Sequence, residues 1–299
     1  MPRFRANFTD NHLAALVTVW RLVNATSQAV AFSQNMPERR DYWKRYLNDL
    51  AEEGWLVSKL IHSTARTGKT GRKLGTLYAL TKEGAAVVAE TIGIEPEEVF
   101  FPRNGIYASS PFQFPHRAEF IEVLALFLGH QKASEGGFEV LDLVPYYRHE
   151  GSNRLGTGKA ATSVQVSGEF KTRTIVPDAL MRFRVGDTVR LAAIEFHRET
   201  DTRGIIEQLR KHGAAIEQGL FSAMFEQGTA NHVLSIHANA DKLRNVRERI
   251  EAGEFPNFSR YAAGFHFATA HDLVVREIDG AFYGINGSKS TIFDCAKGF

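Results

Sequence analysis

The sequence predicts an α+β protein of two domains, and three observations support this fold class. The chain has 299 residues, 43% of them hydrophobic, and is long enough to bury more than one core. Residues 1–82 hold 13 lysines and arginines against 6 acidic residues, whereas the remainder holds 23 against 28. The expected elements also change, from helices with one hairpin to alternating helices and strands. We expect domains over 1–98 and 116–299, joined by a linker over 99–115.

Composition excludes several classes of protein. The chain has no run of about twenty apolar residues, and no apolar block follows the basic Arg3 and Arg5, so neither a membrane span nor a signal peptide is supported. The single cysteine, Cys295, excludes an internal disulfide and a cysteine-based zinc site. We therefore expect a cytoplasmic protein with no membrane partner.

Three helices are expected to open the first domain. Apolar side chains recur at helical spacing over 7–23, after Thr9 as the cap. A second, short helix over 27–32 leads to Pro37, where a third helix begins, because proline is favoured in the first helical turn. The apolar stripe of this third helix directs four polar side chains to solvent or the helix flanks: Arg40, Lys44, Arg45 and Asn48.

A hairpin follows the third helix. Gly54 ends the helix, and residues 55–61 and 76–80 are predicted strands. The segment between them is rich in glycine and has no acidic residue. Glycine lets the backbone approach phosphates closely, and cations neutralise them. The cations of this loop are Arg66, Lys69, Arg72 and Lys73. A further helix over 81–92, capped by Thr81, completes the domain.

This order of elements, together with the sequence Leu-Tyr-Ala-Leu-Thr-Lys-Glu-Gly over 77–84, resembles the winged helix-turn-helix of bacterial transcription and plasmid-control proteins. The cations fall on the third helix and the hairpin tip, the two elements that would touch a duplex. We therefore expect double-stranded DNA as the partner. A winged helix used for protein contacts is the alternative.

The second domain is expected to contain a mixed sheet, with a tight hairpin at Gly186-Asp187. If these two residues are the whole turn, Asp178 lies directly across from Glu195, and a longer turn would shift this register. Two carboxylates on one face at roughly 5 Å weaken a sheet by something like 0.2–1 kcal/mol unless a cation lies between them. Carboxylate oxygens suit Mg²⁺ or Mn²⁺. His197 projects from the same face.

Pro177-Asp178, a hairpin and then Glu195-Phe196-His197 resemble the core of the restriction-endonuclease-like PD-(D/E)xK nucleases, in which an aspartate and a glutamate bind metal and a lysine usually helps to activate water. More narrowly, a helix headed by His116, followed by Pro177-Asp178 and by Ile194–Thr200, is similar to the plasmid replication-relaxation family. That family includes relaxases related to the mobilisation protein MobC, and it also places a winged helix before the nuclease-like domain.

The resemblance implies an α/β nuclease-like domain whose metal ligands are Asp178 and Glu195. It further implies Glu122 as a third carboxylate, with Glu119 as a competing choice. His197 departs from the family pattern, which has lysine or a polar substitute there, and its cation is weaker at neutral pH.

The missing charge could come from Lys211 or Arg210, on a helix expected over 203–218. Two other histidines, His232 and His237, are five residues apart on an expected strand. They therefore lie on opposite faces and cannot share one ion.

These features favour a metal-dependent, site-specific DNA endonuclease, of the nickase or relaxase type, acting in plasmid replication or conjugative mobilisation. Asp178 and Glu195 would hold the ion, and His197 or Lys211 would assist hydrolysis. The alternative is a non-enzymatic replication initiator or transcription regulator, whose nuclease-like domain serves dimerisation or DNA contact. The sequence leaves open a homodimer and contacts with other mobilisation or replication proteins.

Overall fold

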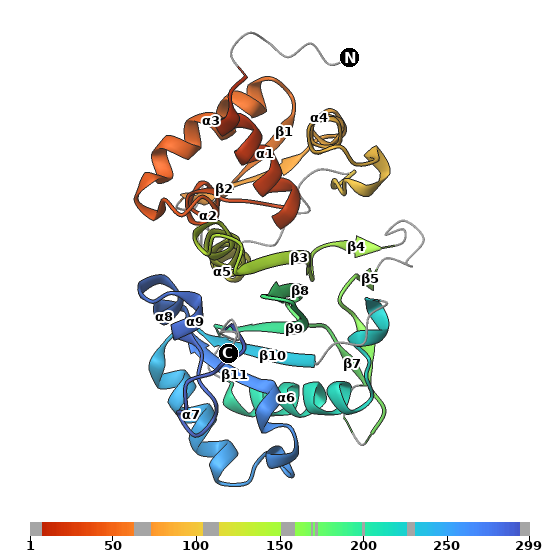
Figure 1. The fold of residues 1–299 in the computed structure, drawn as a ribbon, viewed down its shortest axis with the longest axis vertical. Helices are drawn as coiled ribbons and strands as arrows, with labels where there is room; N and C mark the ends of the chain where they lie inside the picture. Colours follow the sequence, from red (N-terminus) through yellow and green to blue (C-terminus); the bar gives the residue numbers. More distant parts are fainter. Residues whose placement is uncertain are drawn as a thin grey trace, which may run out of the picture. The chain divides into compact units, whose positions relative to one another are not determined.

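The computed structural model describes residues 8–62, 73–103, 114–150, 159–168, 170, 173–198, 201–225 and 231–293. The chain is a mixed α+β protein that divides into two compact units, residues 1–133 and 134–299 (Figure 1). In the described part of the chain, none of the helices has the length and apolar character needed to cross a membrane.

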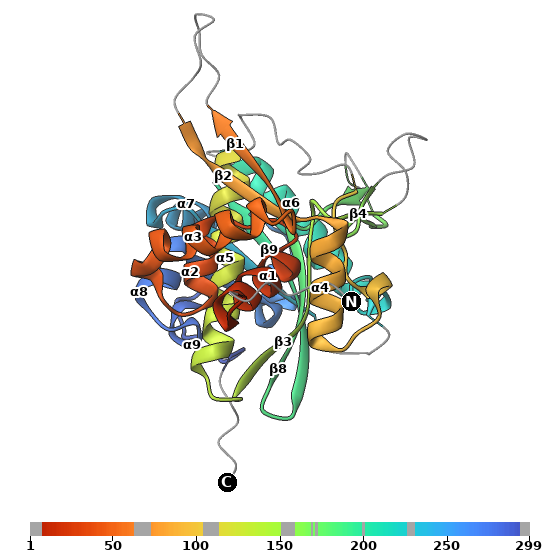
Figure 2. The same cartoon turned by 90° about the horizontal axis from the view of Figure 1, so that it is seen from above.

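The first unit is mostly helical. Its helices are α1 (Asp10–Leu22), α2 (Ser27–Ser33), α3 (Arg40–Glu52), α4 (Lys82–Ile92) and α5 (Phe114–Ala133), with short 3-10 turns η1 (Pro37–Arg39) and η2 (Pro96–Glu98). Its strands β1 (Leu56–His62) and β2 (Lys73–Leu80) form an antiparallel hairpin. In Figure 2 this hairpin extends beyond the helices of the unit.

Threonine side chains fix the start of two of these helices. Thr26 accepts a hydrogen bond from the backbone N–H of Ala29 at 3.0 Å, at the beginning of α2. Thr81 accepts from Gly84 at 3.0 Å, at the beginning of α4, and donates to the carbonyl of Gly54 at 2.8 Å. Each cap satisfies an N–H that has no partner within its helix. The cap expected at Thr81 is confirmed.

The elements expected in the first domain are confirmed, with shifts of a few residues at their ends. The helix expected near Pro37 opens with the turn η1, and α3 follows from Arg40. The expected hairpin is also present, although β2 begins earlier, at Lys73. The remaining three cations of the expected wing lie outside the described residues: Arg66, Lys69 and Arg72.

Helix α5 belongs to the first unit and packs against α2. The contact is close at Gly129, where an added Cβ would lie 2.2 Å from the backbone oxygen of Phe32. The sequence predicts that this helix, with His116 near its start, opens the second domain. The boundary falls after Ala133 instead, because glycine at this position lets the backbones of α5 and α2 approach each other.

The second unit is built on five paired strands. The long strands are β3 (Phe138–Pro145), β8 (Ala179–Val185), β9 (Thr188–His197), β10 (Asn231–His237) and β11 (Phe265–Thr269). Short strands pair in twos: β4 (His149–Glu150) with β5 (Lys159–Ala160), and β6 (Val164–Gln165) with β7 (Thr174–Ile175). Its helices are α6 (Thr202–Glu217), α7 (Ala240–Glu251), α8 (Ala270–Val275) and α9 (Ile278–Ala281), with 3-10 turns η4 (Ser222–Met224), η5 (Phe258–Arg260) and η6 (Ala262–Gly264).

The five-stranded sheet has the order β11-β10-β9-β8-β3. Strands β3, β8 and β9 are antiparallel neighbours, whereas β9, β10 and β11 run parallel, so the mixed sheet predicted from the sequence is confirmed. Helices α6 and α7 connect the parallel strands. Their apolar side chains pack on one face of the sheet in a cluster that includes Ile206, Leu209, Val233, Val246, Phe265 and Phe267.

The turn between β8 and β9 confirms the predicted register. Val185 pairs with Thr188 and Ala179 pairs with Ile194, so Gly186 and Asp187 are the whole turn. Gly186 has a φ of 55°, a left-handed conformation that glycine adopts without strain. The same register, continued by one residue, sets Asp178 across from Glu195.

Candidate nucleic-acid interface and carboxylate site

The outer side of α3 carries the polar residues predicted to meet DNA. Trp43, Leu47 and Leu50 are buried against the unit's core. The side chains predicted to contact DNA are all exposed: Arg40, Lys44, Arg45 and Asn48. Helical periodicity explains this separation, since residues three or four apart share a face. The structure therefore brings these four side chains to one accessible helix.

Several contacts hold the polar residues of α3. The guanidinium of Arg45 lies 5.7 Å from the ring centroid of Tyr42, and that of Arg40 is 3.2 Å from the carboxylate of Asp41. Lys44 makes no hydrogen bond or ion pair with any residue that the structure describes. The cation–π contact orients Arg45 while its guanidinium stays exposed.

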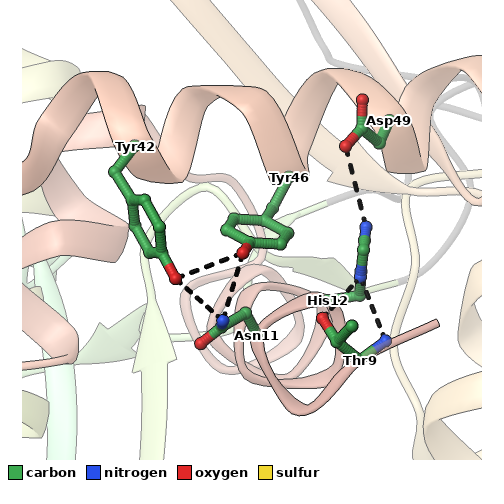
Figure 3. Close-up of polar contacts among 6 residues, drawn as sticks. All are labelled: Thr9, Asn11, His12, Tyr42, Tyr46 and Asp49. Carbon is green, nitrogen blue, oxygen red and sulfur yellow. Dashed lines mark hydrogen bonds and ion pairs between the residues drawn. The ribbon is translucent and has the colours of Figure 1, made fainter. Parts of the chain in front are cut away.

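A network of partly buried hydrogen bonds fixes α3 on α1 (Figure 3). Asn11 donates from Nδ2 to the hydroxyl of Tyr42 at 2.9 Å and to that of Tyr46 at 3.2 Å. The Tyr46 hydroxyl in turn donates to that of Tyr42 at 3.1 Å. These hydrogen bonds restrain the rotation of α3 about its axis, which determines which side chains face outward. The sequence analysis did not identify this network.

The hairpin is tied to α3 through Asn48. Its Oδ1 accepts a hydrogen bond of 2.8 Å from the hydroxyl of Tyr78, on β2. Lys73 is exposed at the start of β2, as are the apolar side chains of Leu60 and Leu74 beside it. The helix and the hairpin are thus one connected surface, with Asn48 engaged as an acceptor within it.

Glu195, predicted to bind metal, is enclosed within the second unit. Its side chain is 1% exposed. Gln208, on α6, donates from Nε2 to Oε2 of Glu195 at 2.5 Å, and Nε2 of His212 contacts Oε1. Burial raises the pKa of Glu195 well above its ordinary value, against the opposing effect of the Gln208 hydrogen bond. Burial also lowers the pKa of His212 to about 3. Both shifts favour the uncharged forms, a neutral carboxyl facing a neutral imidazole.

Asp178 lies immediately before β8 and is half-buried. Its Oδ2 accepts a hydrogen bond of 2.8 Å from the backbone N–H of Phe196. Its own carbonyl accepts from the backbone N–H of Tyr146 at 2.8 Å. The carboxylate is thus bound along the backbone of β9, one residue beyond Glu195.

Further polar groups are buried on β9 and β10 beside Glu195. The rings of His197 and His237 lie 4.8 Å apart, centroid to centroid. Nε2 of His237 is 3.0 Å from Oγ of Ser235, which pairs with Glu195 in the sheet register. Burial, followed by the charge of His197, lowers the pKa of His237 well below its ordinary value. The two imidazoles extend the polar cluster across two parallel strands.

The other predicted catalytic residues lie elsewhere. Lys211, on α6, is 3.5 Å from the carboxylate of Glu207, one helical turn before it. Glu122 lies in the first unit, where Thr26 donates to its Oε1 at 3.1 Å. Burial is the largest effect on the Glu122 carboxyl and raises its pKa to about 7, with a smaller contribution from Glu119. Through Thr26, Glu122 helps to fix the N-terminus of α2.

None of the family models, curated proteins and solved structures compared with the chain matches it. The geometry of the two units is therefore the basis for assigning their function.

The surroundings of Glu195 do not suit Mg²⁺ or Mn²⁺. Both ions favour ionised carboxylates with free oxygens and several further oxygen ligands. Both oxygens of Glu195 instead face hydrogen-bonding groups of α6, and its raised pKa favours the neutral carboxyl. Among the described residues, no group of three or more histidine, cysteine, aspartate or glutamate side chains could hold a metal ion.

The sequence analysis missed two polar pairings of the second unit. Gln208 and His212 are four residues apart on α6 and so share a face, a spacing that was visible in the sequence. His232 is 3.0 Å from His266, between Nδ1 and Nε2, and His266 contacts Ser290 at 2.8 Å. No local pattern links His232 to His266, because they come from separate strands. His232 and His237 are expected on opposite faces of their strand. Their partners agree with this, since His232 contacts His266 and His237 contacts Ser235.

Proposed function

We propose that the first unit binds double-stranded DNA through α3 and the β1–β2 hairpin, and that the chain is a DNA-binding protein of a plasmid or other mobile element. The observation that carries the proposal is the exposed polar side of α3, which stands opposite its buried stripe. The helix α2, a short turn and α3 follow one another as in a helix-turn-helix. The hairpin comes next in the chain, where a wing would lie.

The distribution of charge along α3 supports a polyanionic partner. Arg39, Arg40, Lys44 and Arg45 occupy the N-terminal half of the helix and the turn before it. A helix N-terminus carries partial positive charge and is stabilised by anions, so the two cations at its start, Arg39 and Arg40, are unfavourable for the isolated helix. DNA phosphates bound beside these cations would offset this unfavourable interaction. In helix-turn-helix proteins, residues near the start of the recognition helix are the ones that contact base edges.

The fixed position of α3 also supports recognition of DNA. Asn11 holds two tyrosines of α3 from α1, and Tyr78 holds Asn48 from the hairpin. A helix restrained on both sides presents its cations in one orientation, which lowers the entropy lost on binding. Conformational freedom at the surface remains with the long side chain of Lys44.

For the second unit we propose a non-enzymatic role, in dimerisation. This choice rests on the enclosure of Glu195 by Gln208 and His212. Metal-dependent strand cleavage is the second candidate. It is favoured by the hairpin register, which pairs Ala179 with Ile194 and, continued by one residue, brings Asp178 level with Glu195. It would require the Glu195 carboxylate to leave its partners on α6.

DNA binding is tested by fluorescence anisotropy with a labelled duplex and the full chain. The variant Lys44→Ala/Arg45→Ala should bind at least about tenfold more weakly, since two exposed cations are removed from the proposed interface. Lys242→Ala/Arg244→Ala, on α7, removes the same charges from the second unit and serves as the matched control. Equal affinities for the two double variants would overturn the proposed interface.

Strand cleavage is tested separately, with supercoiled plasmid and either Mg²⁺ or Mn²⁺. We expect the unmodified protein to leave the plasmid intact under conditions in which it binds the duplex. Nicking by the unmodified protein, together with its loss in Glu195→Gln, would show that the second unit is a metal-dependent endonuclease. The non-enzymatic role would then be wrong, while the DNA interface on α3 would stand.

A further inference from the structure

A cavity of about 270 Å³ lies in the first unit, between the start of α1 and the end of α3. Its lining includes three aromatic rings, Phe8, His12 and Trp55, and three acidic residues, Asp49, Glu52 and Glu53. We propose that this cavity binds a small organic cation of the quaternary ammonium type. The site is separate from the basic residues of α3 and does not depend on DNA binding.

The aromatic rings of the cavity support one another. The ring of Phe8 meets that of Trp55 edge-on, with centroids 5.2 Å apart, and stacks on His12 at 5.6 Å. On its other side, His12 meets Tyr46 edge-on at 4.8 Å. Aromatic faces attract cations through their quadrupole, and cages of such rings recognise quaternary ammonium groups.

His12 is held in one orientation (Figure 3). The backbone N–H of Thr9 donates to its Nδ1 at 3.1 Å. Because Nδ1 is an acceptor there, the ring hydrogen of the neutral form is on Nε2, which faces Oδ2 of Asp49 at 3.7 Å. This distance is too long for a hydrogen bond, so Asp49 remains available to a second positive group.

The acidic residues of the cavity lie at the C-terminal end of α3, where negative charge destabilises a helix. The C-terminus of a helix carries partial negative charge and favours cations. The last turn of α3 contains no basic residue, and Asp49, Glu52 and Glu53 cluster there. Glu52 makes no hydrogen bond or ion pair with any residue that the structure describes. A cation in the cavity would relieve repulsion among the carboxylates and with the helix end.

The combination of aromatic and acidic walls selects an organic cation over an inorganic one. A divalent metal ion prefers six or more oxygen ligands and gains little from aromatic faces. Asp49 is 58% exposed, so its carboxylate can act from the rim at long range without desolvation. An alkylammonium group is weakly hydrated, fills apolar space and keeps its charge. It can therefore contact the aromatic rings and interact with the carboxylates of the cavity at the same time.

The test uses choline and its uncharged isostere 3,3-dimethylbutan-1-ol (dimethylbutanol), each titrated into the full chain. The indole N–H of Trp55 is followed in proton–nitrogen correlation spectra and assigned with Trp55→Phe. Choline should shift this resonance in a saturable way, and dimethylbutanol should bind at least about tenfold more weakly, because it lacks the charge. Equal binding of the two compounds, or a choline effect that does not saturate, would overturn the proposal.

Two sets of variants separate the contributions of charge and ring. Glu52→Gln/Glu53→Gln should weaken choline binding severalfold, whereas Glu83→Gln/Glu90→Gln, exposed on α4, should leave it unchanged. Trp55→Leu should reduce it further. The glutamine variants change only exposed side chains and should keep the fold. Unchanged choline affinity in Glu52→Gln/Glu53→Gln would contradict the site, as would an identical shift of the Trp55 resonance by Mg²⁺ alone.

Discussion

Replacing Glu195 with glutamine should change how the stability of the second unit depends on pH. The amide has nearly the shape of the neutral carboxyl and keeps partners for Gln208 and His212, but it does not titrate. Glu195→Ala instead removes the hydrogen-bonding group that faces Gln208 and His212, which stay buried. We expect this variant to lose about 2–4 kcal/mol more folding free energy than Glu195→Gln. The comparison therefore separates the hydrogen bonds of Glu195 from its proton.

The pKa values fix the sign of the effect. The pKa of Glu195 is raised in the folded protein, so its contribution to stability is complete below the unfolded pKa of about 4.5 and is lost as the pH rises towards the folded pKa. The pKa of His212 is lowered to about 3, so its contribution is lost as the pH falls from its ordinary value of 6.5 through 3. The two effects offset between 4.5 and 6.5.

Above that range only the effect of Glu195 remains. The free energy of unfolding should then fall by about 1.4 kcal/mol per pH unit in the unmodified protein, relative to Glu195→Gln, until the folded pKa is reached. Titrating groups that do not contact Glu195 are common to both proteins and cancel in the difference.

The assay is urea denaturation at a series of pH values, followed by both circular dichroism and tryptophan fluorescence. The three tryptophans, Trp20, Trp43 and Trp55, all lie in the first unit. A transition seen by circular dichroism but not by fluorescence therefore reports the second unit. If the stability difference between the unmodified protein and Glu195→Gln is the same at pH 6 and pH 8, Glu195 is ionised when folded. The argument against a metal ligand at this position would then fail.

Two further predictions concern the first unit. Gly129→Ala should destabilise it by several kcal/mol relative to the unmodified protein, or prevent folding, because the new Cβ would lie 2.2 Å from the backbone oxygen of Phe32. Thermal denaturation with fluorescence detection checks this, and equal melting temperatures would refute the close contact. The pKa of Glu122 is raised from 4.5 to about 7, so its stabilising effect is complete below 4.5 and is lost as the pH rises from there through 7; Glu122→Gln should therefore flatten the fluorescence-detected pH dependence between 5 and 7. An unchanged profile would show that the carboxyl near Thr26 is not titrating there.

The features that the sequence predicted well depend on local chemistry. Thr81 caps α4 because its hydroxyl reaches an N–H three residues on, and Gly186 makes a tight turn because it adopts positive φ without strain. The apolar stripe of α3 follows from helical periodicity alone. The outward position of Lys44 and Arg45 was predictable for the same reason.

The features that the sequence did not predict depend on contacts between distant segments. Helix α5 packs with the first unit because Gly129 meets the backbone of α2, and nothing in the local pattern shows which partner a helix will choose. Likewise, the spacing of Gln208 and His212 places both on one face of α6, but only the fold reveals that this face covers Glu195. The hairpin register was therefore right, while the surroundings of its carboxylate were not foreseen.

The salt dependence of duplex binding tests the proposed function most directly. The slope of log affinity against log salt concentration measures the number of phosphates neutralised, at about 0.9 per contact. We predict that Arg45→Ala lowers the magnitude of this slope by about one contact's worth, and that the control Arg244→Ala leaves it unchanged. An unchanged slope and affinity in Arg45→Ala would contradict the assignment of α3 as the DNA-facing helix.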